Sequence, residues 1–97
     1  MSELPIACTL TSSDLQERRT TVLEKFRREI TESKELDNGY AYSLSAETSL
    51  QDLATMIDLE RQCCPFLRFR VEVEPAGVRL ELTGPPGTKE FLSALLE

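Results

Sequence analysis

The chain has 97 residues, of which 40% are hydrophobic and 29% charged, a balance typical of one small globular domain and not of a disordered segment. Its 17 acidic and 11 basic side chains give a formal net charge of −6, which disfavours non-specific binding to nucleic acids and anionic membranes. Histidine is absent from the sequence, so this chain holds no Ser-His-Asp or Cys-His catalytic arrangement and no imidazole metal ligand.

The sequence predicts a cytoplasmic protein. Its first five residues lack the basic start and apolar run of a signal peptide, and no stretch reaches the ~20 apolar residues that a membrane-spanning helix needs. In a reducing compartment, its three cysteines are expected to be thiols.

The N-terminal part of the chain predicts one long amphipathic helix. Residues 6–10 form a short apolar run that suits an edge strand or an extended lead-in. Thr11 is a suitable N-cap, and apolar residues then recur at helical spacing over roughly two dozen residues, with Arg19 among them. The apolar members of this stripe are Leu15, Val22, Phe26 and Ile30. The turn signal at residues 37–39 ends the element.

A strand and a second helix are predicted next. Residues 40–45 alternate apolar with small or polar side chains, which indicates a strand with one buried face. Ser45, Thr48 and Ser49 are candidate caps for the helix that follows, and Pro65 ends it. The predicted apolar face of this helix consists of Leu50, Leu53, Ile57 and Cys64, with Ala54 and Met56 near its margins.

The C-terminal third predicts a hairpin and a closing helix. Residues 67–74 and 78–82 alternate apolar with charged side chains, and residues 75–77 form a turn between them. Depending on the register, Arg70 and Glu72 can face Glu81 and Arg79 across this hairpin. A Gly-Pro-Pro-Gly breaker at residues 84–87 then precedes a short helix over residues 88–97.

Together these elements predict a single α+β domain over residues 1–97. We expect two layers, in which a mostly antiparallel sheet of three or four strands has three helices packed on one face, in the order (β)-α-β-α-β-β-α. The charged face of the hairpin indicates that the other side of the sheet meets water or a polar partner.

The adjacent thiols of Cys63 and Cys64, before Pro65, are the most unusual chemical feature. Two thiols at a helix–strand junction can bind a soft ion such as Hg(II), Cd(II), Cu(I) or a trivalent arsenical. Cys8 is a candidate third sulfur ligand, and Glu60, one turn before Cys64, can add an oxygen. The spacing differs from the CxxC of structural zinc sites and thioredoxin-like redox pairs.

Two physical arguments oppose a site at these thiols. Adjacent residues of a helix point about 100° apart, so both sulfurs reach one ion only if the helix has already unwound there. The partial negative charge at a helix C-terminus also raises the pKa of a thiol, an effect that Arg61 and Arg68 can offset. The alternative is that the cysteines are small buried hydrophobic residues of the core.

Other motifs give weaker signals. The basic residues of the first helix are interleaved with acidic ones, which is typical of a solvated surface and not of a nucleic-acid site. The loop at residues 84–88 lacks the glycine spacing and the lysine of a phosphate-binding loop. We predict no catalytic and no cofactor-binding residue, and an enzyme is the less favoured class.

Several segments resemble a family of short, uncharacterised bacterial proteins. The resemblance rests on the start at residues 8–11, the helix opening at residues 14–19, the run ERQCCPFLRF at residues 60–69 and the run LELTGP at residues 80–85. It extends over nearly the whole chain, and the Cys-Cys-Pro-Phe segment is its most specific part. No established activity accompanies this family, so the resemblance assigns no functional residue.

Two functions remain open on these grounds. The first is a soft-metal- or thiol-binding accessory protein, with Cys63 and Cys64 as ligands and Cys8 as the candidate third ligand. The second is a non-enzymatic protein-interaction module, a homodimer, in which the cysteines are core residues. The apolar side chains of the closing helix favour the second, because so small a domain can have more apolar surface than its own core hides.

Overall fold

The computed structural model describes residues 13–96 and shows an α+β fold of three helices and a four-stranded antiparallel sheet. The helices are α1 (Ser13–Glu29), α2 (Leu50–Cys63) and α3 (Thr88–Leu96). The strands are β1 (Ile30–Leu36), β2 (Gly39–Leu44), β3 (Arg68–Glu74) and β4 (Gly77–Thr83). Helices on one face of an antiparallel sheet confirm the predicted fold class.

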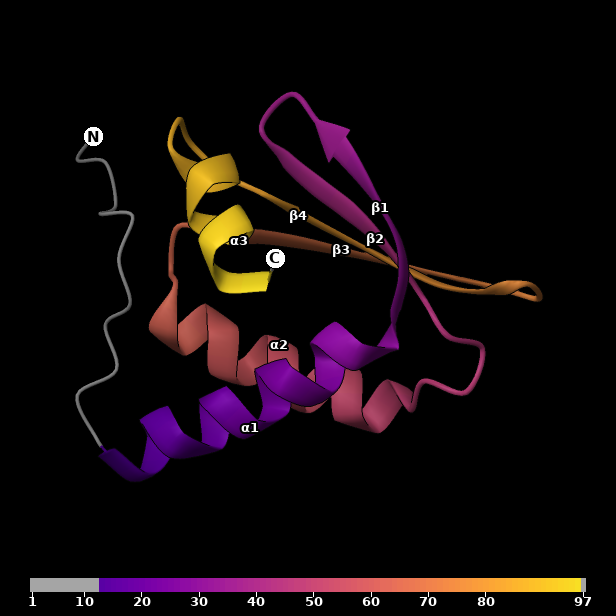
Figure 1. The fold of residues 1–97 in the computed structure, drawn as a ribbon, viewed down its shortest axis with the longest axis horizontal. Coiled ribbons are helices and arrows are strands. Elements are labelled where there is room, and N and C mark those ends of the chain that lie inside the picture. Colours follow the sequence, from indigo (N-terminus) through magenta and orange to yellow (C-terminus); the bar gives the residue numbers. More distant parts are fainter. Residues whose placement is uncertain (1–12, 97) are drawn as a thin grey trace.

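The strand order is β1-β2-β4-β3, so β2 and β4 are central and β1 and β3 form the edges. Two hairpins, β1–β2 and β3–β4, meet through the β2–β4 ladder, where Tyr42 lies opposite Leu80. α1 and α2 lie side by side against one face of this sheet, and α3 packs near β2 (Figure 1). No helix in the described part of the chain is both long and apolar enough to cross a membrane.

The core lies between the sheet and the helices because side chains alternate along the central strands. Tyr42, Leu44, Leu80 and Leu82 are buried on the helix-covered face. The opposite face carries polar pairs such as Ser43 with Arg79. The remaining buried members of the core come mostly from the helices and the α2–β3 junction and include Leu23, Phe26, Leu53, Met56, Cys63, Cys64, Phe66, Leu67, Leu92 and Leu96.

The prediction of a single helix up to the turn at residues 37–39 was wrong. α1 ends at Glu29, and β1 occupies Ile30–Leu36. The sequence of β1, ITESKEL, is apolar only at its two ends and so shows no alternation. Its five central residues are exposed in the structure. Its strand conformation comes from pairing with β2, a tertiary interaction that overrides the local helical pattern. The predicted cap Thr11 and the segment 6–10 lie outside the described residues.

The predicted apolar face of α2 was partly wrong as well. Leu50 is 49% exposed, whereas Met56 and Glu60 are buried. The helix begins as predicted, since the Ser49 side chain accepts a hydrogen bond from the Asp52 backbone N–H. It also ends as predicted, because Cys63 is its last residue before Pro65.

The C-terminal hairpin follows the prediction closely. Arg70 lies opposite Glu81, and Glu72 lies opposite Arg79. Two ion pairs run along the strands, from Arg70 to Glu72 and from Arg79 to Glu81, so the four side chains form one alternating charge cluster on the open face of the sheet.

Gly39 allows the two hairpins to approach each other. A Cβ atom at this position would lie 1.9 Å from the carbonyl oxygen of Leu82 on β4, far inside van der Waals contact.

We therefore predict that Gly39→Ala destabilises the protein by about 2 kcal/mol or more, as overpacking of a core does. Chemical denaturation would measure the loss. Asn38→Ala, in the same turn but exposed, is the matched control, and an equal effect of both variants would contradict the explanation.

Candidate functional site

A buried ion pair connects α1 to α2. The Arg19 guanidinium donates from Nε to Oε1 of Glu60 at 2.7 Å and from one terminal nitrogen to Oε2 at 3.1 Å. The Glu60 side chain is only 3% exposed and that of Arg19 only 14%. Such two-point hydrogen bonding fixes the orientation of both groups. Burial alone would lower the pKa of Arg19, but the hydrogen bond and charge of Glu60 outweigh it and raise this pKa above its ordinary value.

The Cys64 thiol is the third member of this cluster. Its Sγ lies 3.6 Å from Oε2 of Glu60, to which the thiol donates, and 3.7 Å from a terminal nitrogen of Arg19. The residue has no exposed surface. The cluster therefore joins a cation, a carboxylate and a thiol inside the protein, at the junction between α2 and β3.

Burial and charge both keep Cys64 protonated at neutral pH. Loss of solvation raises the pKa of its thiol most, the negative charge of Glu60 raises it further, and Arg19 offsets part of this, so that the pKa reaches about 12. A thiol in this state is a poor nucleophile, because the thiolate is the reactive form.

The backbone at the end of α2 directs the Cys64 side chain towards Glu60. Cys64 is the C-cap residue, and its φ of −122° and ψ of 73° are not helical. Its N–H still reaches the carbonyl of Glu60, one turn earlier. The helix has thus unwound at Cys64, which removes the 100° constraint on the directions of adjacent side chains.

Cys63 differs from Cys64 in its chemical state. It takes part in a disulfide, whereas Cys64 is the free cysteine among the described residues. The expectation that every cysteine is a thiol is thus not met in this structure. Both residues are fully buried in the core.

The structure brings together only part of the predicted metal-ligand set. Cys63 and Cys64 lie at the junction as expected, while Cys8 is outside the described residues, so the set of Cys63, Cys64 and Cys8 stays a prediction. Among residues 13–96, no three Cys, Asp or Glu side chains form a group that could hold a metal ion. Glu60 does lie next to Cys64, as its position one turn earlier indicated.

The cation of the site was assigned to the wrong residues. Arg61 is exposed and pairs with Asp58, and Arg68 is exposed on β3. Arg19 fills this role instead, from a distant part of the chain. The signal for it was present in the sequence, since an arginine inside an apolar helical stripe needs a buried partner.

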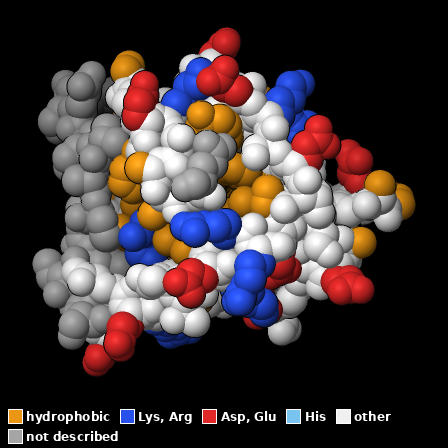
Figure 2. All heavy atoms as spheres, in the orientation of Figure 1, with side chains coloured by type: hydrophobic (Ala, Val, Ile, Leu, Met, Phe, Trp, Pro, Cys, Tyr) orange, Lys and Arg blue, Asp and Glu red, His pale blue; other side chains and the backbone are white. Residues whose placement is uncertain are grey.

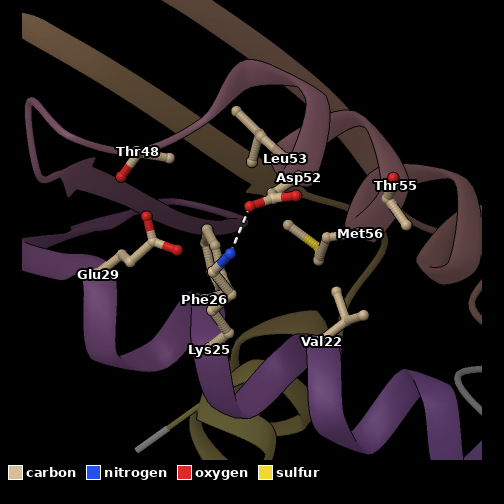
Figure 3. A pocket seen from close by; sticks show the side chains of 9 residues that line it. All are labelled: Val22, Lys25, Phe26, Glu29, Thr48, Asp52, Leu53, Thr55 and Met56. Carbon is tan, nitrogen blue, oxygen red and sulfur yellow. Dashed lines mark hydrogen bonds and ion pairs between the residues drawn. The ribbon is translucent and has the colours of Figure 1, made fainter.

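A separate small hollow lies between α1 and α2, with a volume of about 80 Å³. Val22, Phe26 and Met56 line it, and Figure 3 shows an ion pair between Lys25 of α1 and Asp52 of α2, which line it as well. This hydrogen bond raises the pKa of Lys25. The space suits a few water molecules, and its surface offers no reactive group comparable to the Cys64 cluster.

No protein-family model matches the chain, and neither the curated proteins nor the solved structures include a significant match to it.

We predict that the Arg19–Glu60 pair behaves as a buried ion pair. Arg19→Met should destabilise the protein by about 3 kcal/mol, because it leaves a buried carboxylate without its partner. The double variant Arg19→Met/Glu60→Leu should recover most of this loss, since it removes both charges. Urea denaturation measures each value. The exposed pair provides the control, because Lys25→Met should change stability little. Equal losses in the two single variants would contradict the prediction.

The raised pKa of Cys64 predicts a pH dependence of stability at alkaline pH. The folded state holds this proton more tightly than the unfolded state, so the stabilisation is complete below the ordinary pKa of 9.0 and is lost as the pH rises towards about 12. In that window, the free energy of unfolding should fall more steeply for the natural protein than for Cys64→Ala, by up to about 1.4 kcal/mol per pH unit. Parallel curves for the two proteins would show that the thiol does not titrate in this way.

Proposed function

We propose that the protein is a small soft-metal- or thiol-binding accessory protein whose site is the Cys63–Cys64 pair. The observation that supports this function is the contact between the Cys64 thiol and Glu60, a carboxylate that Arg19 holds in place. A metal ion binds thiolates and must displace the thiol protons, and one of these thiols already donates its proton in a hydrogen bond to Glu60.

Binding of a divalent soft ion by the reduced pair is balanced without any electron transfer. Each cysteine forms one sulfur–metal bond and loses one proton. Both protons pass to the solvent, and that of Cys64 leaves from the hydrogen bond that the thiol donates to Oε2 of Glu60. Once Cys64 is metal-bound, the guanidinium of Arg19 lies beside two groups whose negative charge it can share, Glu60 and the bound sulfur.

The number of sulfur ligands determines which ions fit the site. Two thiolates suffice for ions such as Hg(II) and Cu(I), whereas Cd(II) prefers further ligands. Cys8 is the remaining cysteine of the sequence and our candidate for the third ligand. The unwound backbone at Cys64 supports the proposal, because it permits two neighbouring sulfurs to turn towards one ion.

Binding requires that the disulfide of Cys63 is first reduced, which takes two electrons from a thiol reductant. We therefore place the active form of the protein in a reducing compartment, the cytoplasm, where such reductants keep cysteines as thiols. The disulfide form would then be the inactive state, in which only Cys64 carries a free thiol among the described residues.

We expect the reduced protein to bind one equivalent of Hg(II), and the bound ion to protect Cys63 and Cys64 from a chromogenic disulfide reagent. In a Cys8→Ser background, either Cys63→Ser or Cys64→Ser should abolish the protection of the remaining thiol. Cys8→Ser should keep the binding of Hg(II) and lose that of Cd(II). Unchanged Hg(II) binding by the double variant Cys63→Ser/Cys64→Ser, or natural thiols that react only after unfolding, would refute the proposed site.

Glu60→Gln tests the role of the carboxylate. It should weaken Hg(II) binding by about tenfold or more, as the loss of a group beside a metal ligand commonly does. Asp58→Asn, on the same helix but exposed, is the matched control and should leave the affinity unchanged. Circular dichroism of each variant separates a loss of binding from a loss of folding.

A further inference from the structure

The outer edge of the sheet at β3 has features of an interface that is separate from the thiol site. β3 is an edge strand, so one side of its backbone is unpaired within the described sheet. Val71 is 41% exposed and Val73 is 60% exposed, although they lie opposite Leu80 and Val78 on the helix-covered side of the sheet. The apolar row of this face therefore continues beyond the helices on β3.

The figures show where this edge lies. The β3–β4 hairpin extends past the helices, and its turn lies at the far end of the molecule (Figure 1). In the same orientation, hydrophobic side chains are visible at that end of the surface (Figure 2). No helix of the described chain covers this end, so a partner strand has free access to it.

The charges of β3 are arranged so that the strand complements a second copy of itself. Its sequence is RFRVEVE, with Arg68 and Arg70 in the first half and Glu72 and Glu74 in the second. When two such strands run antiparallel about Val71, each arginine lies opposite a glutamate of the other copy. Opposite charges across an antiparallel pair are stabilising and like charges are destabilising.

We propose that the protein forms a homodimer in which β3 pairs antiparallel with β3 of a second copy, centred on Val71. In this register Arg68 lies opposite Glu74, Arg70 opposite Glu72, and Phe69 opposite Val73, each in both directions. The two sheets then join into one continuous eight-stranded sheet, twice the four strands of one chain. The exposed valines become cross-strand neighbours of apolar side chains, and both β3 edges are removed from solvent.

Other registers of the same strands are less favourable. A shift by one residue places charged side chains opposite apolar ones, because successive side chains point to opposite faces. Centring the pair on Arg70 or on Glu72 places that residue opposite its own copy, with like charges in contact. Among antiparallel pairings of two β3 strands, the charge sequence therefore favours the register centred on Val71.

The opposite edge of the sheet, β1, is a poorer candidate. Its five central residues are exposed and polar or charged, so it offers no apolar row to bury. Its pairing with β2 also contains an irregularity between Ile30 and Glu32, a feature that discourages further strand addition. β1 thus provides a control surface within the same molecule.

Sedimentation velocity over a range of concentrations tests the dimer. We expect a reversible increase to twice the monomer mass at micromolar concentrations, with a single-chain band on a non-reducing gel, which excludes an intermolecular disulfide. Val71→Lys should weaken association at least about tenfold, because it places two like charges across the symmetry axis. Ser33→Lys, at the centre of β1, should leave association unchanged.

A charge exchange tests the register. Arg68 and Glu74 lie opposite Thr83 and Gly77 within their own chain, so neither faces an opposite charge there. Arg68→Glu and Glu74→Arg should each weaken dimerisation, and the double variant Arg68→Glu/Glu74→Arg should restore it, because the charges are again opposite across the interface. If the single variants instead weakened dimerisation by damaging the fold, the double variant would dimerise even less well than either of them.

Three results would overturn the proposal. One is a protein that stays monomeric up to about 100 μM, an affinity too weak for a specific dimer in a cell. Another is a dimer that tolerates Val71→Lys but is lost in Ser33→Lys, which would place the interface on β1. The third is a double charge variant that dimerises no better than the single ones. None of these results depends on the thiol chemistry, because the variants lie on β3 and β1.

Discussion

The bidentate pair between Arg19 and Glu60 is the interaction on which the arrangement of this protein depends. It is the buried polar contact that fixes α1 against α2, and these two helices cover one face of the sheet. The pair cannot lose one member without leaving an unpaired charge in the interior. It also sets the environment of Cys64, so the packing of the helices and the chemistry of the thiol share one cause.

The Arg19–Glu60 pair thus acts both on helix packing and on the Cys64 thiol. Hydrophobic residues of similar size at both positions would hold two helices together equally well. The charged pair differs from such residues in that it also acts on the neighbouring sulfur. Glu60 raises the pKa of the Cys64 thiol, Arg19 lowers it, and the carboxylate stays within reach of the thiol proton. The thiol therefore stays protonated at neutral pH, and its proton lies in a hydrogen bond to the carboxylate.

The sequence predicts most of the fold but misses features that depend on contacts with other elements. The register of the β3–β4 hairpin is fixed only by its pairing in the structure, whereas the hairpin itself and the closing helix follow from strict alternation and from turn residues, which act locally. β1 does not, because its side chains are exposed on both faces and only its pairing with β2 makes it a strand. At the site, the sequence alone groups Glu60 with Cys63 and Cys64, because these residues are close neighbours along the chain. Arg19 lies 41 residues from Glu60, and only the packing of α1 on α2 reveals it as the cation.

The strand order β1-β2-β4-β3 has a consequence for how the chain acquires its structure. Each hairpin joins neighbouring strands and closes over a short loop, whereas the β2–β4 ladder joins residues on either side of α2, such as Gly39 and Thr83. Closing a longer loop costs more entropy, and contacts between distant residues form more slowly. The two helix–hairpin halves can therefore form early and separately, and the β2–β4 ladder is the contact that unites them. Gly39 lies at one end of that ladder, so a substitution there should slow folding as well as lower the final stability.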